Sequence, residues 1–91
     1  MTDEQRAIRG NQARDLLDNP LLKDAFEAVD RYLDNQALAC NPDDRDQAQR
    51  VILSKQIFQA LRREIVRIVE DGQIATVRLR EVERKRGLFK R

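Results

Sequence analysis

The stretch of residues 43–71 constrains the chain most, because it is the longest uninterrupted helical pattern and contains no Gly or Pro. Asn41 and Pro42 precede it, and they supply a helix cap and a favoured first helical residue. Gly72 follows it and is typical of a left-handed helix C-cap. The pattern therefore predicts a helix over residues 42–71. Its main apolar face comprises Val51, Ile57, Phe58, Leu61, Ile65, Ile68 and Val69.

A second helix is predicted over residues 20–39. Asn19 is a good N-cap, and Pro20 is well tolerated at the first helical position. Apolar residues then recur on one side of the helix, and an acidic, solvated side lies opposite. Short connections join antiparallel helices, so the few residues between the two patterns predict an antiparallel helical hairpin.

The N-terminal pattern is weaker. Thr2 can cap an amphipathic stretch, but Gly10 and Asn11 interrupt it. We therefore expect a mobile start and a short helix only over residues 11–18.

After Gly72 the apolar spacing fits either a strand or a helix. No second strand is available for pairing, so a short helix over residues 74–86 is favoured. It would lie within a basic C-terminal segment, residues 73–91, whose last residues 87–91 form a loose end.

Ninety-one residues form one all-α domain, residues 1–91, with only a thin core. The first hairpin arm is too short to cover the longer arm. Either the terminal segments fold back over the surplus apolar surface, or another chain covers it. We favour an oligomeric helical bundle, with Ile52, Leu53 and Val66 outside the main stripe as the key contacts. The predicted protein interface comprises Ile52, Leu53, Phe58, Leu61, Ile65, Val66 and Ile68.

Positive charge is concentrated at the C-terminus. Residues 78–91 contain seven Lys or Arg and two Glu, a net charge of +5, whereas residues 1–77 carry −3. Such a segment can contact nucleic-acid phosphates, dock on an acidic partner, or remain a solvated terminus. The candidate residues are Arg78, Arg80, Arg84, Lys85, Arg86, Lys90 and Arg91.

Side chains for catalysis or metal binding are scarce. The chain has no His, and its single Cys40 lacks a partner base, so it is interpreted as a structural thiol. Asp43, Asp44 and Asp46 are explained by the start of a helix. We predict no enzymatic activity, no cofactor and no metal site.

The N-terminus is charged and polar, which argues against a signal peptide, and no apolar stretch is long enough to span a membrane. A soluble, intracellular protein without a membrane partner is expected.

Residues 10–75 resemble a group of small proteins encoded in tailed-phage and prophage genomes. Those proteins typically start with Gly-x-x-Ala-x-x-Leu-Leu-x-x-Pro-Leu, and their long helix typically ends with an Ile or Leu, an acid, a Gly and an Ile-Ala or Leu-Ala step. They carry a Trp at the position of residues 35–37, where this chain has Asn-Gln-Ala, and the basic tail is not typical of them. The matching residues are Gly10, Ala13, Leu16, Leu17, Pro20, Leu21, Ile68, Val69, Gly72, Ile74 and Ala75.

The resemblance implies a phage setting, in the host cytoplasm or the virion, among head and packaging proteins. The first hypothesis is a structural or assembly protein that self-associates and docks on other virion or packaging proteins. The alternative is a packaging or regulatory factor that binds nucleic acid through its basic tail.

Overall fold

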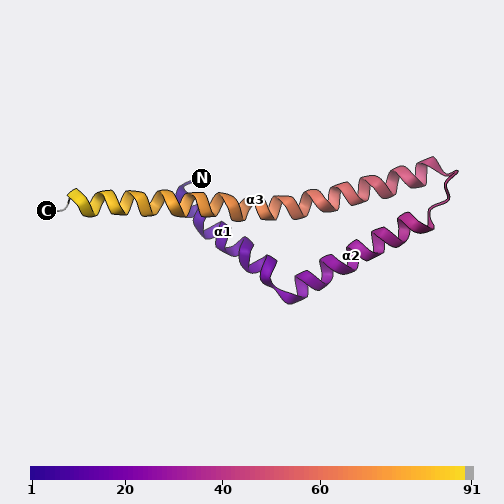
Figure 1. Cartoon of the computed structure of the whole chain (residues 1–91), viewed down its shortest axis with the longest axis horizontal. Helices are drawn as coiled ribbons and strands as arrows, with labels where there is room; N and C mark the ends of the chain where they lie inside the picture. The colour runs from indigo at the N-terminus through magenta and orange to yellow at the C-terminus, as the bar shows by residue number, and fades with distance from the viewer. Residues whose placement is uncertain (90–91) are drawn as a thin grey trace. The chain divides into compact units, whose positions relative to one another are not determined.

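A computed structural model describes residues 1–89. In this range the fold is all-α, as predicted, with three helices and no strand. They are α1 (Asp3–Asp18), α2 (Pro20–Ala39) and α3 (Arg45–Phe89), and Figure 1 shows α3 as the longest of them.

The chain forms two compact units. Unit 1 contains Met1–Leu17 and Glu64–Arg91, so α1 packs there with the C-terminal part of α3. Unit 2 is Asp18–Arg63, so it contains α2 and the N-terminal part of α3.

Helix α1 is longer than predicted. Thr2 caps it, since its Oγ1 accepts from the Gln5 backbone N at 3.2 Å and its backbone N donates to the Gln5 Oε1 at 3.0 Å. The expected interruption at Gly10 and Asn11 is wrong, because the helix is continuous from Asp3–Asp18. A helical Gly costs about 1 kcal/mol relative to Ala, and here the missing side chain allows a close helix contact described below.

Helix α2 begins and ends at the residues that the sequence indicated. The Asn19 side chain accepts hydrogen bonds from the backbone N of Leu21 and Leu22, at 2.9 and 3.3 Å, and Pro20 is the first helical residue. The helix ends at Ala39, and Cys40 lies in extended backbone with a half-buried side chain.

Helix α3 begins three residues later than predicted. Asn41 forms a turn instead of capping the helix, since its Oδ1 accepts from the backbone N of Asp43 at 3.0 Å. Asp44 is the cap, because its Oδ1 accepts from the Gln47 backbone N at 3.0 Å. The acidic cluster therefore acts largely through one capping carboxylate.

Helix α3 does not end at Gly72. It continues to Phe89, and no glycine in the described range has a positive φ, so the predicted left-handed cap is wrong. The predicted separate helix over residues 74–86 and the first residues of the predicted loose end are the last turns of α3. Lys90 and Arg91 lie outside the described residues.

The buried positions are few and small. In the described range they are Gly10, Ala13, Gly72 and Ala75, and all four belong to unit 1. No described side chain larger than alanine is buried in either unit. Within residues 1–89, no helix combines the length and the apolar composition that a membrane-spanning segment requires.

Candidate binding surfaces

The centre of unit 1 is a contact between two glycines. A Cβ atom built on Gly10 would lie 2.6 Å from the Gly72 Cα, and one built on Gly72 would lie 2.6 Å from the Gly10 Cα. Ala13 and Ala75, each three residues further along its helix, are 5% and 1% exposed. Small residues at this spacing on both helices allow their backbones to approach closely, and the contact sets the positions of the side chains around it.

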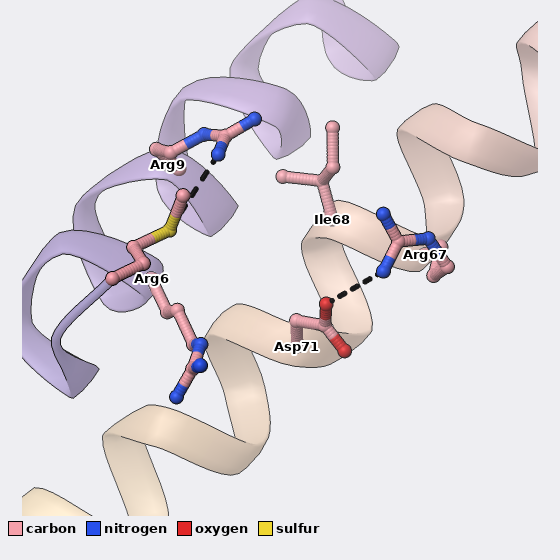
Figure 2. A pocket seen from close by; sticks show the side chains of 6 residues that line it. Arg6, Arg9, Arg67, Ile68 and Asp71 are labelled. Atoms are coloured by element: carbon pink, nitrogen blue, oxygen red, sulfur yellow. Dashed lines mark hydrogen bonds and ion pairs between the residues drawn. The ribbon is translucent and has the colours of Figure 1, made fainter.

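One groove beside this contact is rich in arginine, and two of its three arginines pair with carboxylates. It encloses about 240 Å³ and is lined by Met1, Arg6, Arg9, Arg67, Ile68 and Asp71. Figure 2 shows Arg6 and Arg9 of α1 near Arg67 and Asp71 of α3. Arg67 donates to Asp71 at 3.1 Å, and Arg6 donates to Asp3 at 3.2 Å. Arg9 donates to the Met1 sulfur at 3.5 Å.

Arg67 also binds Glu64, one turn earlier on α3. The hydrogen bond from Arg67 lowers the pKa of the Glu64 carboxyl below its ordinary value, and the positive charges of Arg67 and Arg9 act in the same direction. The same hydrogen bond raises the pKa of Arg67. Arg6 and Arg67 on this side of unit 1 therefore already have carboxylate partners.

A second groove of unit 1 has a different charge balance. It encloses about 380 Å³ and contains two arginines, Arg14 of α1 and Arg80 of α3, but no carboxylate. Amide groups and small apolar side chains complete it. Its lining residues are Gly10, Asn11, Arg14, Val69, Gly72, Gln73, Thr76, Val77 and Arg80.

In unit 2, α2 and α3 contact through aromatic and charged side chains. The Phe26 and Phe58 rings form an edge-to-face pair with centroids 5.5 Å apart. The Arg62 guanidinium lies 5.3 and 5.4 Å from the two ring centroids and pairs with Asp30 at 3.0 Å. Arg62 of α3 therefore contacts side chains of both helices.

A second ion pair extends this contact, because Lys55 donates to Asp34 at 2.6 Å. Asp30 and Asp34 both lie on the acidic side of α2, which the sequence pattern assigned to solvent. The half-buried residues of α3 in unit 2 include Val51, Lys55, Phe58 and Arg62, spaced by four, three and four. This stripe mixes apolar and charged residues, so a search for apolar residues alone missed Lys55 and Arg62; heptad spacing was the available signal.

In unit 2, only part of the predicted apolar face of α3 therefore packs against α2. Ile57 was assigned to that face but is 70% exposed, and Leu61 is 53% exposed. Their places in the contact with α2 are taken by Lys55 and Arg62.

The predicted interface residues are divided between the two units. Phe58 contacts α2, whereas Ile68 lines the first groove of unit 1, and Ile65 is half-buried. Ile52 and Leu61 are nine residues apart, which places them on opposite sides of α3. Leu53 and Val66 are exposed, at 48% and 39%.

The predicted basic residues lie on the last turns of α3. The described ones are all exposed: Arg78, Arg80, Arg84, Lys85 and Arg86. Arg78 lies 3.8 Å from Asp3 and Arg84 lies 3.4 Å from Glu81. Lys90 and Arg91 are outside the described residues. Arg14, on the other helix of the second groove, was not among the predicted residues.

No family model matches this chain, and neither a curated protein nor a solved structure is significantly similar to it.

Proposed function

We propose that the chain is a non-enzymatic structural or assembly protein that acts through helix-mediated self-association and docking on other proteins. The observation that carries this proposal is the absence of a buried side chain larger than alanine among the described residues. Ordering one residue costs about 1–2 kcal/mol of backbone entropy, and burial of apolar area must offset that cost. A second copy can supply the missing burial.

The order of contacts in unit 2 supports an antiparallel pair of helices. Along α2, Asp30 pairs with Arg62, and Asp34, one turn later, pairs with the earlier residue Lys55. Two antiparallel helices form a layer with two sides, and a layer of this kind is half of a four-helix bundle.

Apolar residues gather on one side of that layer. On α2 they are spaced by four, three and four: Leu21, Ala25, Ala28 and Tyr32. On α3 the counterparts are Ile57 and Leu61. On each helix, the half-buried residues mark the side that faces the other helix. Each apolar strip is rotated from that side by roughly a third of a turn, in the same rotational sense on both helices. Because the helices run in opposite directions, equal rotations place both strips on the same side.

The two strips are complementary in size. In the proposed surface, the short side chains of Ala25 and Ala28 form a channel on α2, whereas the longer side chains of Ile57 and Leu61 form a ridge on α3. Leu21 and Tyr32 flank the channel and are 78% and 61% exposed. A two-fold axis would place the ridge of each copy in the channel of the other, which makes a self-complementary interface. This surface replaces the predicted emphasis on Ile52, Leu53 and Val66.

The resemblance of residues 10–75 to small phage proteins supports the setting of this proposal. It favours a role in the virion or in packaging, in the host cytoplasm or the particle, with other virion or packaging proteins as partners.

The decisive variants are Ile57→Asp and Ile52→Asp. Both place a carboxylate at an exposed apolar position of α3 in unit 2, but on different sides of the helix. Light scattering should show that Ile57→Asp lowers the assembled mass, because a buried unpaired charge is costly, while Ile52→Asp leaves it unchanged. Equal masses for the two variants would contradict the proposed surface.

The second candidate function is nucleic-acid binding through the basic segment. The observation that favours it is the continuity of α3 through Gly72 to Phe89, which places exposed basic residues on a helix. The test is DNA affinity against salt concentration for the full chain and for the triple variant Arg84→Gln, Lys85→Gln, Arg86→Gln. A role for these residues predicts weaker binding and a shallower salt dependence in the variant. Unchanged binding would remove this candidate.

A further inference from the structure

We infer that the second groove of unit 1, lined by Arg14 and Arg80, binds the phosphodiester backbone of a nucleic acid. The inference deepens the second candidate function by naming the site, and it does not depend on self-association. The site shares Arg80 with the basic segment and adds Arg14, which belongs to α1 and is far from that segment in the sequence.

The charge balance of the groove points to an anion. Its lining contains two guanidinium groups and no carboxylate. Neither Arg14 nor Arg80 forms an ion pair within 4.0 Å with the side chains of residues 1–88. In the other groove of the same unit, Arg6 pairs with Asp3 and Arg67 pairs with Glu64 and Asp71, so two of its three arginines already have carboxylate partners. Two like charges on one groove raise its affinity for an anion.

The glycine contact fixes the separation of the two helices that carry the arginines. Gly10 and Gly72 line the groove, and their backbones are in direct contact. Arg14 is four residues from Gly10, and Arg80 is eight residues from Gly72, so both side chains extend from helices whose separation is fixed at the glycines. Guanidinium groups bind phosphate oxygens with paired hydrogen bonds. The amides of Asn11 and Gln73 offer neutral donors in the same groove.

The pattern on α3 favours a polymer over a single phosphate. Arg84, which pairs with Glu81 at 3.4 Å, lies four residues beyond Arg80, about one turn further along the same side of the helix. Successive phosphates of one strand can therefore meet arginines inside and beyond the groove. Arg78, which lies toward Asp3, is outside this row. Phosphate contacts of this kind carry no sequence information, so we expect binding to DNA of any sequence.

The test is the binding of fluorescently labelled duplex DNA to the full-length protein by anisotropy, between about 50 and 200 mM KCl. Arg14→Gln should weaken binding about five-fold or more and reduce the slope of log affinity against log salt by about 0.9. Arg14→Lys should keep most of the slope, because it keeps the charge. The matched control is Arg63→Gln, an exposed arginine of α3 in unit 2, which should change the affinity less than about two-fold.

Circular dichroism and the assembled mass must be unchanged in Arg14→Gln, so that a loss of binding reports on the groove. If Arg14→Gln and Arg63→Gln behave alike while the triple tail variant loses affinity, the groove inference is wrong and the tail candidate stands. If the wild-type protein binds no DNA, both are wrong. Competition by polyglutamate as effective as by unlabelled DNA would also overturn the inference, because it would indicate an acidic protein as the ligand.

Discussion

Gly10 and Gly72 bring the backbones of α1 and α3 together so closely that a Cβ atom on either residue would lie 2.6 Å from the Cα of the other. On Gly72 the added atom would also meet the Arg6 carbonyl oxygen at 2.9 Å. These neighbours are backbone atoms, so they cannot yield by a change of rotamer. Within unit 1, the position of α1 against α3 therefore depends on two residues without side chains.

The first prediction concerns these glycines. Gly10→Ala or Gly72→Ala should destabilise the protein by about 1–2 kcal/mol, because overpacking outweighs the gain in helix propensity. The control is Gly87→Ala, since a Cβ at Gly87 has no heavy atom within 4 Å. That variant should be neutral or more stable. Urea unfolding measures all three, and equal effects at the three glycines would contradict the close contact.

The second prediction concerns the ion pairs of unit 2. A double-mutant cycle with Asp30→Asn and Arg62→Gln should give a coupling energy of about 0.5–1 kcal/mol, because the pair is partly exposed and screened by salt. The same cycle for Asp34 and Lys55 should give less, since the Asp34 side chain is 60% exposed. A larger coupling for the outer pair would show that Arg62 is not the central contact between the helices.

The third prediction concerns the pH dependence of Glu64. Its pKa is lowered by the hydrogen bond from Arg67, so its carboxylate form is favoured in the folded state. The contribution to stability is present above the unfolded pKa and is lost as the pH falls through the folded pKa. An NMR titration should place the Glu64 midpoint below its ordinary value, and Arg67→Gln should move it upward. An unshifted midpoint in both proteins would contradict the pairing.

The sequence predicted α2 well and the C-terminal half of α3 poorly, for a physical reason. Asn19 and Pro20 act through local backbone chemistry, which a sequence shows directly. Gly72 has two uses, a left-handed cap or a close helix contact, and the choice depends on Gly10, which is distant in the sequence. Small residues three apart on both helices, Gly10 with Ala13 and Gly72 with Ala75, were the signal for the contact.

The residues of the binding surfaces were also only partly predictable from the sequence. An apolar search placed Ile57 inside and overlooked Arg62, although Arg62 contacts two aromatic rings and an acid on α2. A long aliphatic stem lets an arginine occupy an inward position while its charged group stays partly solvated. A periodicity search that counts only apolar residues cannot assign a charged residue such as Arg62 to the contact between two helices. Arg14 and Arg80 line one groove because α1 packs against α3. The sequence pattern could not predict that these two arginines lie in the same groove.

Sedimentation equilibrium over a wide concentration range measures whether a second copy supplies the burial that one chain lacks. We expect a mass of at least twice the 10.7 kDa of one chain, with dissociation accompanied by loss of helicity. A single, fully helical species of 10.7 kDa at every concentration would contradict it.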